Sequence, residues 1–296
     1  MHTHSLRAMR IIAAAVLALA ALPALAVEND LLADHEQRLA SAQAEGSAAK
    51  SNADKARALR RQAAELDSLG KSAEALSVID EALKLAEPGR DKDFLATKAG
   101  ILFSLNDPQG ALALLAPQLD ATRKFAERAG AERRMSALGF FTEGFITATF
   151  AHIQLEQWRE AIVTLADAEA PLEGQSFYAY RSLVYRYIMG RAKDAALANP
   201  QLEKMAAYYA KNDKGHYGAL LRLWQGEDTR QELAALIAGM PGQEQQEASG
   251  EVLFYSAAYA KFIKGDAEGA RTMLGSLNRV APYGSIEWIY GKRVLQ

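Results

Sequence analysis

Small and large apolar residues recur at helical spacing after about residue 53, and short turn signals interrupt them. In the clearest stretch, Leu59, Ala63 and Leu66 fall at i, i+4 and i+7, which places them on one face of a helix. Gly70 follows and can end that helix in a left-handed conformation, and Pro88 prevents the next helix from continuing. The pattern predicts two helices joined by a tight turn.

This turn signal recurs along the chain as a turn residue followed five positions later by alanine. The copies are Gly70 with Ala75, Asn106 with Ala111, Glu156 with Ala161, Gly190 with Ala195, Gly265 with Ala270, and a degraded copy at Gly226. Successive copies are 36, 50, 34, 36 and 39 residues apart. A period in the mid-thirties is typical of an array of helix pairs, so we predict an all-α solenoid of about six helical hairpins.

The array accounts for most of the chain but not for its ends. We predict a signal peptide over residues 1–26, a polar helix and linker over 27–52, and the solenoid over 53–296, closed by a capping helix near 284–296. The interval of 50 residues predicts an inserted helix near 121–138, which carries five Lys or Arg residues.

The first hairpin resembles the tetratricopeptide (TPR) repeat in its order of large and small residues. The matching positions are Leu59, Ala63, Leu66, Gly70, Ala75, Ile79, Ala82 and Pro88. Alanine at the crossing points lets two helices approach closely, while leucine or isoleucine fills the space beside them. The resemblance implies a concave surface lined by the first helix of each pair, with a protein or peptide as the partner.

The last third of the chain is similar to the NlpI-type adaptors of the bacterial envelope. The similarity covers roughly residues 214–296 and rests on Leu220–Thr229, Glu232-Leu233, Phe254-Tyr255, Lys264-Gly265-Asp266, Pro282 and Glu287. These adaptors are TPR proteins that bring a periplasmic protease to cell-wall hydrolases. The chain departs from them because it has no cysteine for lipidation.

The first 26 residues predict that the protein is exported. Arg7 and Arg10 precede an apolar run over 11–22, and Ala24-Leu25-Ala26 predicts cleavage before Val27. The run is shorter than the ~20 residues that span a bilayer. With no cysteine for a disulfide or an acyl anchor, these features predict a periplasmic protein of a Gram-negative bacterium that is not a lipoprotein.

The charge balance bears on the partner. The formal net charge is −2, and it becomes −4 when the two arginines of residues 1–26 are removed. Proteins that bind nucleic acid present a strongly basic face, so this balance argues against such a partner. Arg57, Arg60 and Arg61 do form a basic patch on the first repeat helix, which we interpret as a solvated helix face.

Aromatic residues supply the candidate binding surface. If the first helix of each pair lines the concave face, three sets of side chains point toward it: Tyr180, Val184 and Tyr187; Tyr255, Tyr259 and Phe262; and Phe150 with His216. Tyrosine and arginine are good contact residues on such a surface. The alternative is that the rings fill the core of irregular repeats. The candidate partner-binding residues are Phe150, Tyr180, Arg181, Val184, Tyr187, His216, Tyr255, Tyr259 and Phe262.

Few residues form a pattern that is typical of a catalytic, metal or cofactor site. His152 and Glu156 lie at i and i+4 and could share a helix face, but two ligands alone make a poor metal site. We find no nucleophile elbow and no dinucleotide-binding glycine pattern, and we expect no cofactor and no metal.

The sequence therefore predicts a non-catalytic periplasmic adaptor or scaffold that holds a protein segment in its concave face. Two alternatives remain: a structural component of an envelope export or secretion assembly, and a metal-dependent enzyme that uses His152 and Glu156. Self-association through exposed ends of the array is a further expectation.

Overall fold

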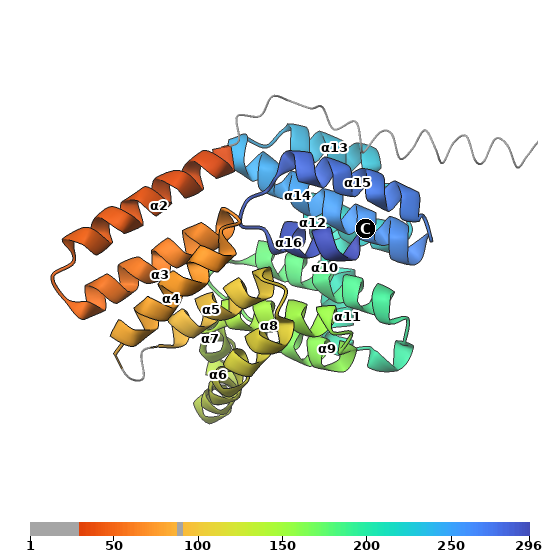
Figure 1. The fold of residues 1–296 in the computed structure, drawn as a ribbon. Coiled ribbons are helices and arrows are strands. Elements are labelled where there is room, and N and C mark those ends of the chain that lie inside the picture. The colour runs from red at the N-terminus through yellow and green to blue at the C-terminus, as the bar shows by residue number, and fades with distance from the viewer. Residues whose placement is uncertain (1–29, 88–90) are drawn as a thin grey trace, which may run out of the picture. The chain divides into compact units, whose positions relative to one another are not determined.

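The computed structural model describes residues 30–87 and 91–296, and every regular element within these ranges is helical (Figure 1). This confirms the predicted all-α fold of helical hairpins. The chain divides into two compact units. One comprises residues 32–206, and the other comprises residues 207–296 together with residues 30 and 31.

The first unit contains three complete helix pairs and most of a fourth. In each pair the two helices differ in length. An irregular insertion follows the second pair. In chain order the elements are α2 (Asp30–Ala48), α3 (Asn52–Ser68), α4 (Ser72–Leu85), α5 (Lys92–Ser104), α6 (Pro108–Ala129), η1 (Ala131–Arg133), α7 (Arg134–Gly139), α8 (Thr142–Gln154), α9 (Trp158–Asp167), α10 (Gln175–Ala192), η2 (Ala195–Leu197) and the start of α11 (Pro200–Asn212).

The second unit continues the hairpin pattern. Beyond the end of α11, α12 pairs with α13 and α14 pairs with α15, and a π-helical turn extends α14. A final helix packs against both members of the last pair. The elements are α12 (His216–Trp224), α13 (Arg230–Ala238), α14 (Gly242–Ala258), η3 (Tyr259–Ile263), α15 (Ala267–Val280) and α16 (Ile286–Val294). Within the described residues the predicted six pairs and the capping helix are therefore present.

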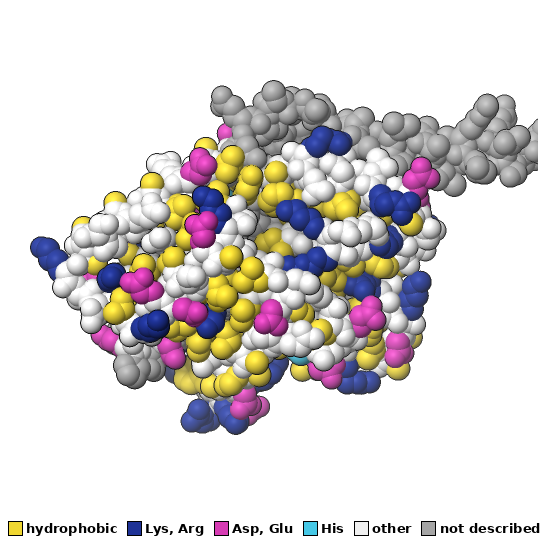
Figure 2. Space-filling model, viewed as in Figure 1, with side chains coloured by type: hydrophobic (Ala, Val, Ile, Leu, Met, Phe, Trp, Pro, Cys, Tyr) yellow, Lys and Arg dark blue, Asp and Glu magenta, His cyan; other side chains and the backbone are white. Residues whose placement is uncertain are grey.

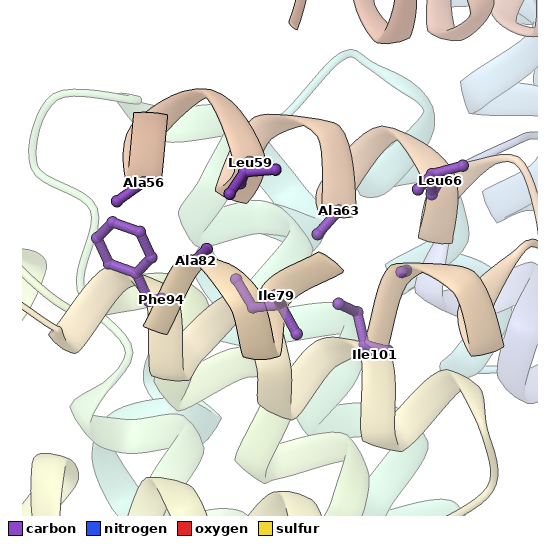
Figure 3. Close-up of a cluster of buried hydrophobic side chains, with 9 residues drawn as sticks. Ala56, Leu59, Ala63, Leu66, Ile79, Ala82, Phe94 and Ile101 are labelled. Atoms are coloured by element: carbon purple, nitrogen blue, oxygen red, sulfur yellow. The ribbon is translucent and has the colours of Figure 1, made fainter. Parts of the chain in front are cut away.

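The core of the first pair explains the alternation of small and large residues. Ala63 and Ala82 are fully buried where α3 and α4 meet, and Leu59 and Ile79 fill the space between the helices (Figure 3). Phe94 from α5 joins the same cluster. Burying a side chain the size of Ile79 stabilises the fold by roughly 1.5–3 kcal/mol. The pattern thus holds successive pairs together as well as the two helices of one pair.

The recurrent turn signal has a common conformation. Gly70, Gly226 and Gly265 have φ values of 77°, 98° and 73°, and Asn106 and Glu156 have φ values of 67° and 58°. A left-handed residue ends each first helix, because it reverses the chain while the preceding carbonyl groups still accept hydrogen bonds. The signal in the sequence is thus a conformational requirement, which glycine meets at least cost.

Two details of the predicted pattern are wrong. Gly190 lies inside α10, and the left-handed residue that ends this helix is Lys193, with φ 51°. The insertion near 121–138 is not one extra helix. Its first part extends α6 through Pro117 to Ala129, and its second part forms η1 and α7. Periodicity alone missed both because α6 and α10 continue their helical patterns past the expected ends.

Within the described ranges no helix is long and apolar enough to cross a bilayer. The predicted signal peptide, residues 1–26, lies outside the described residues.

Candidate partner-binding groove

The first helices of successive pairs form a continuous row in the first unit. α3 packs against α5, and α5 packs against α8, whereas α4, α6 and α9 make no comparable contact with one another. Where one row of helices is packed more closely than the other, the array must curve toward the closer row. The row formed by α3, α5 and α8 is therefore the inner face of this unit.

An open hollow of about 370 Å³ lies on this inner row, between the start of α3 and the start of α5. Alanine side chains from α3 make room for it, and charged side chains surround it. Its lining residues are Ala53, Ala56, Arg57, Arg60, Ala86, Glu87, Lys92, Asp93 and Phe94. We call this hollow the α3–α5 groove.

Cations of the groove lie over buried aromatic rings. The Arg60 guanidinium carbon is 6.0 Å from the centre of the Phe94 ring, and the Lys92 ammonium is 4.4 Å from the centre of the Phe141 ring. Such contacts hold a cation in place without neutralising it. Within the described residues neither Arg60 nor Lys92 forms an ion pair. Burial lowers the pKa of Lys92, which shows that this ammonium is partly withdrawn from water.

Glu143, on α8, lies near the charged residues of the groove. Its pKa is raised because nearby protein atoms reduce its hydration. The Arg60 guanidinium lowers the pKa of Glu143 and the Asp93 carboxylate raises it. The Glu143 carboxyl on α8 is therefore close enough to Arg60 on α3 and Asp93 on α5 for their charges to act on it.

The groove offers a partner both charges and an apolar floor. Arg57, Arg60 and Lys92 can bind carboxylate or carbonyl oxygens, and Asp93 and Glu143 can bind cationic groups or backbone N–H groups. Charges of both signs are also interspersed over the face shown in Figure 2, in agreement with the small formal net charge. An extended polypeptide with mixed side chains fits such a surface better than a polyanion does.

Six of the nine candidate residues from the aromatic sets are buried. Phe150, Val184, Tyr187 and Tyr255 have no exposed surface, and Arg181 and Tyr259 retain 1% and 7%. These values fit the alternative that the rings fill the core of the irregular pairs. A partner at the surface cannot contact a fully buried side chain in this structure.

Three candidate residues are partly exposed: Tyr180, His216 and Phe262. His216 Nε2 lies 2.7 Å from Glu251 Oε2, and the Tyr217 hydroxyl donates to Glu251 Oε1 at 2.8 Å. Burial and the nearby carboxylates raise the pKa of Tyr217. His216 therefore belongs to a hydrogen-bonded cluster on α12 and α14. A binding role for the three remains a prediction.

His152 and Glu156, the two residues of the enzyme hypothesis, form hydrogen bonds with different neighbours. His152 Nδ1 lies 2.8 Å from Gln157 Oε1, while Glu156 Oε1 accepts a hydrogen bond from Arg191 at 3.1 Å. Neither contact joins His152 to Glu156. Within the described ranges no three His, Cys, Asp or Glu side chains are grouped so that they could hold a metal ion.

The sequence pattern identified only part of the groove. Arg57 and Arg60 stood out as a basic patch, but Lys92, Asp93 and Glu143 did not. A usable signal was present, because Arg57 and Asp93 are separated by 36 residues, the interval between the first two turn signals. Residues one period apart occupy equivalent places on successive first helices, so aligning the charged residues on the period would have brought these two together.

No protein-family model and no curated protein matches the chain.

Proposed function

We propose that this protein is a non-catalytic TPR-type adaptor that holds a segment of another protein in the α3–α5 groove. The observation that carries the proposal is the pair of cations Arg60 and Lys92, held over aromatic rings on the inner row of helices and without ion-pair partners among the described residues. The Asp93 carboxylate lies in the same hollow, but among the described residues it forms no ion pair with either cation. Both cations therefore keep hydrogen-bond donors that a bound segment could use through a carboxylate or several carbonyl oxygens.

The rigid frame supports the same role. Apolar contacts join α3, α4 and α5 into one core beneath the groove, so the lining side chains stand on a preformed surface. A preformed surface reduces the entropy that is lost when a flexible segment binds. The adaptor would therefore act by presenting its partner in a fixed position, without any chemical step of its own.

Site-specific photo-crosslinking in the producing cell tests this function. We would place the photoreactive residue at Arg57, in the groove, and at Glu74, an exposed position on α4, as the control. A defined partner should be captured from position 57 and not from position 74. Capture of the same proteins from both positions, or of none from position 57, would contradict the proposal.

A second measurement ties the captured partner to the two cations. Arg60→Gln and Lys92→Gln should each weaken binding of the purified partner by about tenfold, which corresponds to about 1.4 kcal/mol. The matched control is Lys84→Gln, an exposed lysine on α4 outside the groove, which should leave the affinity unchanged. Equal affinities for all three variants would remove the groove from the function.

The location of the adaptor is part of the proposal. The basic start, apolar run and small-residue site of residues 1–26 support export to the periplasm. Cell fractionation followed by N-terminal sequencing should find the protein in the periplasmic fraction with Val27 as its first residue. Recovery of an uncleaved cytoplasmic protein would contradict this part.

A further inference from the structure

Exposed apolar side chains occur on neighbouring segments of the first unit that do not line the α3–α5 groove. Eight large hydrophobic side chains are exposed in the described residues, and four of them come from the end of α6, from α7 and its C-terminal neighbour, or from the segment after α9. Soluble chains rarely expose such groups together without a partner. The four are Phe125, Met135, Phe140 and Leu172, with exposed fractions of 50%, 49%, 71% and 100%.

Two of the segments that carry these side chains are in contact. A methyl group added at Gly139, the last residue of α7, would lie only 2.7 Å from Pro171 Cδ. The hydroxyl group of Thr142 also donates to the carbonyl oxygen of Gly139 at 3.1 Å and to that of Glu169. Phe140 and Leu172 are the immediate neighbours of Gly139 and Pro171, so they lie on adjoining segments. We call this surface the α7 tip.

The α7 tip projects and is held in shape. α6 has 22 residues, whereas α5 and α8 have 13 each, so α6 reaches beyond the neighbouring helices with α7 beside it (Figure 1). Arg123 Nε and Arg134 Nη2 both donate to the Asp167 carboxylate, at 2.7 and 3.0 Å. Because Arg123 is on α6 and Arg134 on α7, the single carboxylate fixes the insertion to the end of α9.

The charges beside the α7 tip identify the kind of partner. Glu127 and Arg128 occupy the last turn of α6, and Glu132 and Arg133 lie in η1, just before α7. None of these four side chains forms an ion pair within the described residues. The other basic groups here are paired, Lys124 with Asp120 and both Arg123 and Arg134 with Asp167, and the exposed Glu173 follows Leu172. Five basic and five acidic groups therefore make the surface neutral, and the four unpaired ones can pair with those of a second copy. An anionic membrane or a polyanion would instead favour an excess of cations.

We propose that the α7 tip binds the α7 tip of a second copy of this chain, with a two-fold axis relating the copies. In such an arrangement the same patch meets itself, so Phe140 and Leu172 lose water on both copies and each Arg can face a Glu of the other. The inference does not depend on the proposed function.

Sedimentation velocity of the mature chain over two decades of concentration tests the dimer. The wild-type chain should shift from monomer to dimer as concentration rises. Phe140→Ser with Leu172→Ser should remain a monomer over the whole range. The matched control is Ile263→Ser, which changes an exposed apolar residue of the second unit and should associate like the wild type. Thermal unfolding of each variant verifies that the fold is intact.

A charge-exchange experiment shows whether the two tips meet each other. Arg128→Glu with Arg133→Glu gives four negative charges at the tip, and Glu127→Arg with Glu132→Arg gives four positive charges. Each double variant alone should associate at least tenfold more weakly than the wild type, whereas an equimolar mixture should form a heterodimer.

Three results would overturn the inference. The first is a wild-type chain that stays monomeric at every concentration. The second is a dimer that Ile263→Ser abolishes and the tip variant does not. The third is a monomer that co-sediments with vesicles of phosphatidylglycerol and phosphatidylethanolamine through Phe140 and Leu172, because the occupant of the tip would then be a membrane surface.

Discussion

Arg181 and Glu169 form an ion pair inside the core, with 2.9 Å between Arg181 Nη1 and Glu169 Oε1 and side-chain exposures of only 2% and 7%. The same nitrogen donates to the carbonyl oxygen of Ala168, and the Tyr178 hydroxyl donates to Glu169 Oε2 at 2.9 Å. These contacts join α10 to the segment that follows α9. Arg181, a candidate for partner binding in the sequence, thus connects two successive pairs.

Removing one member of this buried pair should strongly destabilise the fold. We expect Arg181→Met to lower the free energy of unfolding by about 3–5 kcal/mol, because the buried Glu169 carboxylate loses its cationic partner and keeps only the hydrogen bond from Tyr178. The measurement is urea denaturation followed by circular dichroism. The control is Lys55→Ala, which removes an ion pair with Glu81 at the surface and should cost less than about 1 kcal/mol. Equal losses for the two variants would mean that the core pair contributes no more than a surface pair.

At the left-handed turns, replacing glycine by another residue and replacing another residue by glycine should have opposite effects on stability. Gly70→Ala should destabilise by about 1–2 kcal/mol, because its φ of 77° disfavours a side chain although no atom lies near the added methyl group. Lys193→Gly should instead be neutral or stabilise by up to about 1 kcal/mol, because it relieves the strain of a φ of 51°. Chemical denaturation measures both changes. A loss of stability in Lys193→Gly would show that the Lys193 side chain contributes more than the strain costs.

Burial of Asp67 predicts a pH-dependent contribution to stability. Burial raises the pKa of Asp67, although hydrogen bonds from Ser72 and Ser104 oppose the change. Because the folded chain holds this proton more tightly than the unfolded chain, the free energy of unfolding falls as pH rises from the usual aspartate pKa through the raised value. The wild type should therefore lose stability relative to Asp67→Asn as pH rises above the usual aspartate pKa of about 3.9.

Denaturation of both proteins over this pH range gives the difference directly. Asp228→Asn is the control, because the contribution of Asp228 to stability should change with pH in the opposite direction. A hydrogen bond from Arg230 lowers the pKa of Asp228, so its contribution to stability is present above the usual aspartate pKa and is lost as pH falls through the lowered value. A difference between the wild type and Asp67→Asn that stays constant with pH would contradict the assigned cause.

The sequence was a good guide to the hairpins because their turns need a rare conformation. Gly70, Gly226 and Gly265 indicate a positive φ directly, and the buried alanines five positions after Gly70 and Gly265 indicate a close helix contact. Lys193 could not be found in this way, because a lysine carries no visible preference for the left-handed region. Nearby Gly190 satisfied the pattern instead, although α10 continues past it.

The candidate site was less accessible to sequence reasoning. Helical spacing shows which residues share a face, but it does not show whether that face meets solvent or the next pair. Tyr187 and Tyr255 each lie on a helix face that the fold buries, whereas Arg60 and Lys92 meet in a groove that needs two consecutive pairs to exist. Contacts between repeats decide both outcomes, and a single repeat contains neither.

The Asp167 carboxylate predicts how the α7 tip can be loosened without changing its surface. Asp167→Ala removes the acceptor shared by Arg123 and Arg134, so α7 should separate from α9 more often. Trypsin should then cleave after Arg133 or Arg134 about tenfold faster or more, because cleavage needs local opening of the chain. Asp120→Ala is the matched control, since it removes only the surface pair with Lys124 on α6. Equal cleavage rates at Arg133 and Arg134 in the two variants would show that the tip is held by its apolar contacts and not by the shared carboxylate.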